Sequence, residues 1–302
     1  MKIKSLKLKN YRNYDILNLD FDEAANIFYG DNAQGKTNIL EAVYLTGTTK
    51  SHRGAKDREM IKFGCDESHL ETIVEKNGID YQIDMHLKKT GSKGIAINKI
   101  PIKRASELFG IVNLVFFSPE DLNVIKNGPS ERRRFIDMEL SQLDKVYMNN
   151  LLNYNKIVNQ RNHLLKEISF GDRVSLESTL DVWDMQLVHY GNKIIERRTE
   201  FIQEMNEIIA SIHKKLTGDR EDIKVIYEPH NGSMDLEDAL KKNRDRDLRL
   251  KSTSTGPHRD DICFMTGDLD IRKYGSQGQQ RTAALSLKLS EIEMVKRAIH
   301  DT

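Results

Sequence analysis

The sequence has few cysteines and no long apolar run. Cys65 and Cys263 are the only two cysteines among 302 residues, and no CxxC pair occurs. This pattern excludes a disulfide scaffold and a cysteine zinc site, and it fits a reducing cytosol. No apolar stretch approaches membrane-spanning length, and Met1-Lys2-Ile3-Lys4 is not followed by the apolar segment of a signal peptide. We therefore expect a cytoplasmic protein with no membrane partner.

The sequence also lacks an excess of charge of either sign. It has 47 Lys and Arg against 46 Asp and Glu, which gives a net charge of +1. Any nucleic-acid surface must therefore be a local patch of basic residues, because the chain as a whole is not basic. The length predicts a large core divided over two lobes.

The clearest motif is a phosphate-binding P-loop, G-x-x-x-x-G-K-[ST], with a predicted strand at Asn26–Tyr29 before it and a predicted helix from Asn38 to Leu45 after it. This order aims backbone N–H groups and a helix N-terminus at a polyphosphate. The lysine would reach the β- and γ-phosphates of ATP, and the threonine would be a Mg²⁺ ligand. The alternative is a glycine-containing turn that matches by chance, and the flanking pattern disfavours it. The motif consists of Gly30, Asp31, Asn32, Ala33, Gln34, Gly35, Lys36 and Thr37.

The first part of the chain predicts mainly strands. Ile3 to Leu8 and Ile16 to Phe21 alternate as strands, and Asn77-Gly78 is a strong hairpin signal between strands 71–74 and 81–87. A short strand pair is predicted within 94–102, and an apolar strand at Val112 to Phe117.

From Ser118 to about Lys242 the pattern predicts mostly helix, with Ser118 as a cap and Pro119 in the first turn. The longest helix is predicted from Leu176 to Leu216, and a helix at Tyr147 to Ile168 would pair with it as an arm.

The last part returns to strand and then helix. Strands are predicted at Ile262 to Met265 and at 269–272, followed by a helix with Leu285, Leu289, Ile292, Val295 and Ile299 on its apolar face. A glycine–serine loop opens this helix and is a second possible anion site, although serine and glycine also cap ordinary helices. Beside a P-loop, it has the form of a signature loop that completes a partner subunit's site. The loop consists of Gly275, Ser276, Gln277, Gly278 and Gln279.

Over essentially its whole length, the chain resembles the RecF family of bacterial recombination mediators, ATPases of the SMC-like branch of the ABC superfamily. A further segment, 51–56, resembles the arginine loop of SMC heads. The matching stretches are 10–14, the P-loop, 117–122, 129–137, 256–261 and 276–281.

The resemblance implies an α/β fold, an ABC/SMC-type P-loop ATPase head with a mixed sheet around the P-loop helix and an inserted helical arm. The expected domains are a first ATPase lobe at 1–117, the helical arm at 118–250 and a signature hairpin and helix at 251–302. It also implies ATP and Mg²⁺ as cofactors and a homodimer that forms on ATP. That dimer would bind DNA at gaps or single-strand/double-strand junctions and act with RecO and RecR to help load RecA.

Several further residues have an expected functional role, and for some of them a purely structural role is the alternative. Arg12 and Arg53 would reach the phosphates, and Ser118 and Glu120 would belong to a Q-loop-like segment. Arg132, Arg133 and Arg134 could touch DNA or form structural ion pairs, with neither favoured. His258 is expected to be a structural turn residue more than a base, and Asp260 and Asp261 could organise the signature hairpin instead of binding metal.

The sequence departs from the family in one respect. The acidic strand that holds Mg²⁺ and orients the attacking water is expected after the signature helix, where this sequence stops at Thr302. We therefore expect weak, DNA-stimulated ATP hydrolysis in a longer protein and negligible hydrolysis by these 302 residues. No catalytic residue is certain. If hydrolysis does occur, Glu120 and Asp121 are the first candidates for the catalytic carboxylate. Two alternatives stay open: a nucleotide-binding scaffold, and a small-molecule kinase that does not act on DNA.

Overall fold

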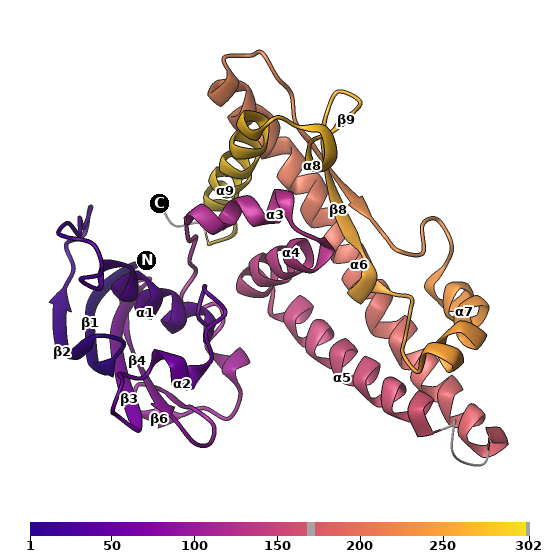
Figure 1. Ribbon diagram of the computed structural model, residues 1–302, viewed down its shortest axis with the longest axis horizontal. Helices are drawn as coiled ribbons and strands as arrows, with labels where there is room; N and C mark the ends of the chain where they lie inside the picture. The colour runs from indigo at the N-terminus through magenta and orange to yellow at the C-terminus, as the bar shows by residue number, and fades with distance from the viewer. Residues whose placement is uncertain (168–172, 300–302) are drawn as a thin grey trace. The chain divides into compact units, whose positions relative to one another are not determined.

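The computed structural model describes residues 1–167 and 173–299 (Figure 1). The chain forms two compact units: unit 1 spans Met1–Phe116 and unit 2 begins at Phe117. Unit 2 contains both the predicted helical arm and the segment that follows it. Of the helices that the structure describes, none combines the length and the apolar character that crossing a bilayer requires.

Unit 1 is built on a six-stranded sheet in the order β2-β1-β3-β4-β5-β6, in which all neighbours are antiparallel. The predicted hairpin is confirmed, because Lys76 pairs with Ile79 across Asn77 and Gly78, which both have positive φ. The strands are β1 (Lys2–Tyr11), β2 (Tyr14–Asp20), β3 (Glu67–Lys76), β4 (Ile79–Lys88), β5 (Gly94–Ile97) and β6 (Ile100–Pro101).

The helix that follows the P-loop, α1 (Lys36–Thr48), packs on this sheet. Alternate residues of β3 are buried, as expected of a strand with one covered face. The hydroxyls of Thr46 on α1 and Thr72 on β3 lie 3.0 Å apart, so even the polar groups at this contact are satisfied. The short α2 (Asp57–Met60) and the 3-10 helix η1 (Ala105–Glu107) complete the unit.

Two predicted strands of unit 1 are wrong. Asn26–Tyr29 forms no strand, and Ile27 and Tyr29 are 83% and 91% exposed. Val112 to Phe117 makes only an isolated bridge between Val112 and Phe109. Both segments are apolar, but neither has a ladder partner among the described strands.

Unit 2 is mainly helical. The predicted long helix is confirmed as α6 (Arg173–Thr217), and its predicted partner as α5 (Lys145–Glu167); Ile168, the predicted end of the partner helix, lies outside the described residues. The pair is antiparallel, because Arg161 contacts Asp184 while Tyr147 contacts Arg198. The other helices are η2 (Pro119–Asp121), α3 (Leu122–Lys126), α4 (Pro129–Leu143), α7 (Leu236–Leu250), η3 (Pro257–Arg259), α8 (Ile271–Tyr274) and α9 (Gln277–Ile299).

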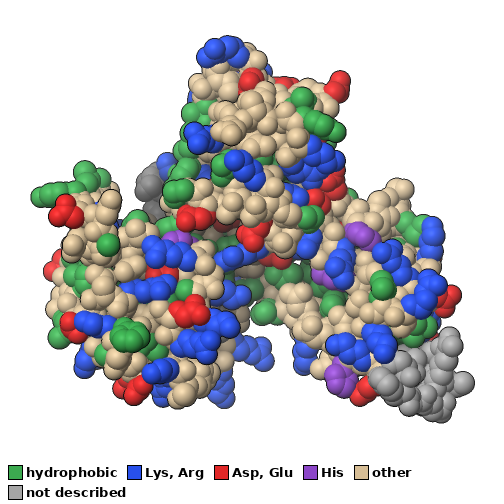
Figure 2. Space-filling view, viewed as in Figure 1, with side chains coloured by type: hydrophobic (Ala, Val, Ile, Leu, Met, Phe, Trp, Pro, Cys, Tyr) green, Lys and Arg blue, Asp and Glu red, His purple; other side chains and the backbone are tan. Residues whose placement is uncertain are grey.

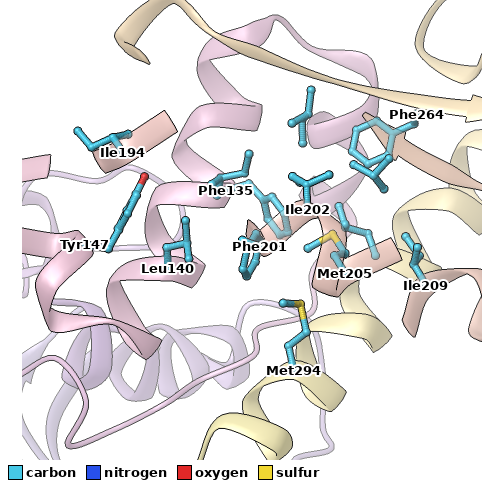
Figure 3. Close-up of a cluster of buried hydrophobic side chains, with 14 of the residues drawn as sticks. Phe135, Leu140, Tyr147, Ile194, Phe201, Ile202, Met205, Ile209, Phe264 and Met294 are labelled. Atoms are coloured by element: carbon cyan, nitrogen blue, oxygen red, sulfur yellow. The ribbon is translucent and has the colours of Figure 1, made fainter. Parts of the chain in front are cut away.

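The core of unit 2 lies where α4, α5, α6, α9 and a small antiparallel sheet meet. Figure 3 shows apolar side chains from these elements around the aromatic rings of Phe135 and Phe201. The sheet has the order β7-β8-β9 and consists of β7 (Lys224–Glu228), β8 (Asp261–Thr266) and β9 (Leu269–Asp270). The core includes Leu140, Tyr147, Ile194, Ile202, Met205, Ile209, Phe264 and Met294.

Three predictions in unit 2 need correction. The region predicted as mostly helical up to Lys242 is interrupted by β7, whose partner β8 comes much later in the sequence. The strand predicted at 269–272 ends at Asp270, because the Asp270 carboxylate accepts a hydrogen bond from the Arg272 amide (3.0 Å) and caps α8.

The third correction concerns the buried face of α9. Leu285 and Ile292, predicted as core residues, are 38% and 37% exposed. The small residues Ala283, Ala284 and Ser286 are buried instead, and the Ser286 hydroxyl lies 2.8 Å from Nδ1 of the α6 residue His213. Leu287 and Met294 are buried as well, so the buried face of α9 is rotated from the predicted one and combines small and large side chains.

Candidate nucleotide-binding site

The P-loop has the backbone geometry of an anion cradle. Gly30, Ala33 and Gly35 have φ values of 138°, 64° and 98°, in the left-handed region that glycine tolerates best. Gly35 is the N-cap of α1, and its neighbours supply no side-chain cap within the described chain. The Asn38 amide donates to the Gly35 carbonyl (2.7 Å), which leaves the amides of Lys36 and Thr37 directed toward an anionic ligand.

Lys36 and Thr37 stand at this helix start. The Lys36 ammonium donates hydrogen bonds to the carbonyls of Gly30 (2.7 Å) and Asp31 (2.6 Å), so its charge lies over the loop itself. The Thr37 side chain is exposed. The predicted motif residues are therefore gathered around one helix N-terminus.

Two polar side chains hold the loop from the side of the β1–β2 turn, and Asn38 on α1 supports one of them. Asn13 and Tyr14 donate to the Gln34 carbonyl (3.2 and 3.4 Å), and Asn38 donates to the Asn13 amide oxygen (2.9 Å). A Cβ atom at Gly35 would lie 2.6 Å from both the Asn13 oxygen and the Tyr14 hydroxyl. Glycine is thus needed at this position for space as well as for its φ.

Arg12 differs from its predicted role as a phosphate ligand. Its guanidinium forms a two-pronged ion pair with Glu41 (Nε–Oε2 and Nη2–Oε1, both 2.7 Å), and Nη1 donates to the Glu59 carbonyl (2.7 Å). Burial alone would raise the pKa of Glu41, but the hydrogen bonds from Arg12 and Ser51 outweigh it and lower that pKa. The structure therefore uses Arg12 as a structural cation that ties the β1–β2 turn to α1.

Arg53, unlike Arg12, is accessible to a ligand. Its side chain is exposed and lines a surface pocket of ≈ 760 Å³ together with Arg12, Asn13 and Asn38. Asn13 and Asn38 also brace the P-loop, so Arg53 lies beside the start of α1. Its contact with phosphate stays a prediction.

The predicted signature loop forms a capping box in unit 2. The Ser276 hydroxyl accepts a hydrogen bond from the Gln279 amide (3.2 Å), and the Gln279 side chain accepts one from the Ser276 amide (2.9 Å). A Cβ atom at Gly275 would lie 2.7 Å from the Ile271 carbonyl oxygen, whereas Gly278 and Gln277 are exposed. Ordinary capping therefore accounts for the serine locally, and a role across a dimer stays a prediction.

The Q-loop-like segment begins with a second capping box, which confirms the predicted cap at Ser118. The Ser118 amide donates to the Asp121 carboxylate (2.6 Å). Burial raises the pKa of Asp121, and Glu120 is exposed.

The arginine run of α4 resolves into different roles. Arg132 is buried and forms a two-pronged ion pair with Asp261 (2.6 and 3.0 Å), and Arg133 donates to the Asp260 carbonyl (2.7 Å). Arg134 is exposed. At least one structural ion pair is thus present. Of the three arginines, Arg134 is the one whose exposed side chain is accessible to DNA.

The Gly-Pro-His-Arg-Asp-Asp segment has structural contacts, in line with the turn role expected for His258. His258 lies between the Tyr154 hydroxyl (2.8 Å from Nδ1) and the Thr253 carbonyl (3.0 Å from Nε2). Burial lowers the pKa of His258 to about 4, so the ring is neutral at neutral pH. Asp260 accepts hydrogen bonds from Tyr227 and from the His230 amide.

Sequence reasoning missed Glu41, and it gave no role to Asn13 and Tyr14, which lie in the matching stretch 10–14. Glu41 had one signal, because it is the only charged residue in the predicted helix 38–45. Its partner Arg12 is 29 positions away, and no local pattern indicates that pairing.

A P-loop at the start of a helix packed on a sheet, joined to a unit with a long helix pair, defines the class of P-loop ATPases. In agreement, residues 1–254 match the family described as AAA ATPase domain. The Smc head domain of Pyrococcus furiosus has a similar fold (TM-score 0.51, 16% identity, 97% of this chain and 79% of that one).

Within that class the chain is similar to DNA replication and repair protein RecF. It is 62% identical over 302 residues to the protein of Lachnospira eligens, covering 100% of this chain and 83% of that relative. A solved structure of the recombination mediator protein RecF with ATP, in the RecFOR pathway, is 35% identical with a TM-score of 0.93 (99% of this chain, 82% of that one). The chain belongs to the RecF family, as its motifs predict, and these relatives do not favour a small-molecule kinase.

Proposed function

We propose that this protein is an ATP-dependent DNA-binding protein of recombinational repair and replication restart. In this proposal two copies dimerise on ATP, bind DNA at gaps or single-strand/double-strand junctions in the cytoplasm, and help load RecA together with RecO and RecR. Membership of the RecF family supports this role. The observation that carries the nucleotide part is the open N-terminus of α1, with Lys36 held over the loop.

The residues at this helix start suit a magnesium-bound nucleotide. Unpaired N–H groups and the Lys36 ammonium would hold the β- and γ-phosphates. The exposed Thr37 hydroxyl would supply one Mg²⁺ ligand, and phosphate oxygens and water would supply the others, as is usual for this ion. Arg53 would neutralise further phosphate charge from the rim of the pocket.

The dimer would bring the Ser276–Gly278 loop of one copy to the P-loop of another. The exposure of Ser276, Gln277 and Gly278 suits this role, because an interface needs accessible backbone groups. DNA contacts would come from local basic residues, since basic and acidic side chains are interspersed on the face shown in Figure 2. Affinity for DNA would then fall steeply with salt and vary little with sequence.

Binding of a labelled ATP analogue to Lys36→Ala tests the proposal. This variant should bind at least about tenfold more weakly, because it loses the charge that faces the phosphates. Lys88→Ala, which removes an exposed lysine from the same unit, is the matched control and should bind as the unaltered chain does. Unchanged binding by a folded Lys36→Ala protein would contradict the P-loop assignment.

A further inference from the structure

The P-loop helix contains a buried carboxylate that the nucleotide-binding motif does not use. Glu41 lies on α1 with a fully buried side chain, and both of its oxygens accept hydrogen bonds. Arg12 donates to each oxygen at 2.7 Å, and the Ser51 hydroxyl donates to Oε1 at 2.5 Å. A buried charge is costly unless it is paired and hydrogen-bonded, and here both conditions are met.

The partners of Glu41 belong to the two segments that border the P-loop. Arg12 precedes Asn13, which donates to the Gln34 carbonyl in the P-loop. On the other side, the Ser51 hydroxyl accepts a hydrogen bond from the Arg53 amide (3.1 Å). One carboxylate on α1 therefore connects, through hydrogen bonds, the turn that braces the P-loop and the backbone that carries Arg53.

We infer that Glu41 is a positioning residue for nucleotide binding: acting through Ser51, it fixes the backbone of Arg53 so that this arginine stands beside the phosphate site. The inference rests on the proposed function. Arg12 has Nε, Nη1 and Nη2 all engaged, so Arg53 is the better placed of the two arginines to reach a ligand. Holding its backbone in advance reduces the entropy that the loop loses when a nucleotide binds.

A purely structural Glu41 would have different consequences. An ion pair that only stabilises the fold lowers the melting temperature when it is broken, whether or not Arg53 is present. A positioning residue acts through Arg53, so its loss should matter less once the Arg53 guanidinium is removed. A double-mutant cycle measures this difference directly.

The experiment compares the affinity for a labelled ATP analogue among Ser51→Ala, Glu41→Gln, Arg53→Ala and the two doubles with Arg53→Ala. Arg53→Ala should weaken binding about tenfold, as expected for one charge-assisted contact. Ser51→Ala should weaken it about three- to tenfold, with no further loss in the Arg53→Ala background. Glu41→Gln should weaken it at least as much, and less in the Arg53→Ala background, where only its effect through Arg12 and the turn that braces the P-loop remains. Thr46→Val is the control, since Thr46 is a buried hydroxyl on α1 that bonds to Ala42 and Thr72.

Thr46→Val should lower the melting temperature and leave affinity unchanged in both backgrounds. Ser51→Ala tests the inference even if Glu41→Gln does not fold, because it leaves the ion pair of Glu41 with Arg12 in place. Equal losses from Ser51→Ala with and without Arg53, or an Arg53→Ala variant that binds normally, would overturn the inference. Unchanged binding by Lys36→Ala would instead overturn the proposed function, and the inference with it.

Discussion

Replacing Gly35 by alanine should disable the P-loop while leaving the sheet folded. The new Cβ would lie 2.6 Å from the Asn13 amide oxygen and 2.6 Å from the Tyr14 hydroxyl. These distances are shorter than any ordinary van der Waals contact, so either the loop or the β1–β2 turn has to move. Gly35 also has φ = 98°, a conformation that alanine adopts at a cost.

Two contributions set the size of the effect. The left-handed backbone costs roughly 1–2 kcal/mol for a residue with a side chain. Displacing Asn13 and Tyr14 also breaks their two hydrogen bonds to the Gln34 carbonyl, at about 0.5–1.5 kcal/mol each. The second contribution acts on the loop that holds the ligand, so ATP affinity should fall by at least about tenfold.

Gly78→Ala separates these contributions. Gly78 lies in the β3–β4 turn with φ = 74°, and a Cβ there would meet nothing within 4 Å. It should therefore lose stability in thermal melts but bind a labelled ATP analogue normally. If Gly35→Ala binds as well as Gly78→Ala does at equal loss of stability, the contact with Asn13 and Tyr14 does not shape the site.

Three further predictions concern unit 2. Arg132→Ala removes one of two arginine partners of Asp261, which keeps its contact with Arg272 (2.9 Å), and should cost about 1.5–3 kcal/mol in urea unfolding, whereas the exposed Arg134→Ala should change stability by less than about 0.5 kcal/mol; equal losses would contradict a structural Arg132 pair. Burial lowers the pKa of His258 to about 4, below its ordinary 6.5, so its contribution of about 3 kcal/mol is present above pH 6.5 and lost as the pH falls to 4. The melting temperature should fall less steeply with decreasing pH in this range for His258→Gln than for the unaltered chain. Parallel plots of melting temperature against pH would refute the burial argument. Ser276→Arg should prevent ATP-induced dimers in light scattering without changing ATP binding to the monomer, and persistent dimers would exclude the proposed interface.

Sequence patterns predicted the elements whose signals are local. The hairpin at Asn77-Gly78, the capped turn at Ser118 and the long helix α6 all depend on residues close together in the chain. The strand predicted at Asn26–Tyr29 was wrong, because an apolar run indicates a tendency to be buried but does not supply a neighbouring strand. The strand β7 was missed for the converse reason, since it pairs with β8 about forty positions later.

The candidate site was predictable to the same extent. The P-loop motif located the loop that has the backbone geometry of an anion cradle, because its glycines and lysine are fixed by spacing. The ion pair of Arg12 with Glu41 was not predictable, because it depends on how the β1–β2 turn meets α1. On α9, the buried face contains Ala283 and Leu287 and leaves Leu285 exposed, because the orientation of the helix depends on partners that are distant in the sequence.

The position of β1 in the sheet has a consequence for how the protein folds. β1 pairs with β3, so that Leu8 lies opposite Leu70, and the P-loop and α1 fall inside the chain segment that this pairing closes. The β3–β4 hairpin can form locally and early, but closing the larger segment has an entropic cost that must be met first. During refolding, ATP binding should therefore appear only with the slower β1–β3 pairing. A nascent chain would gain its nucleotide site only after β3 has left the ribosome.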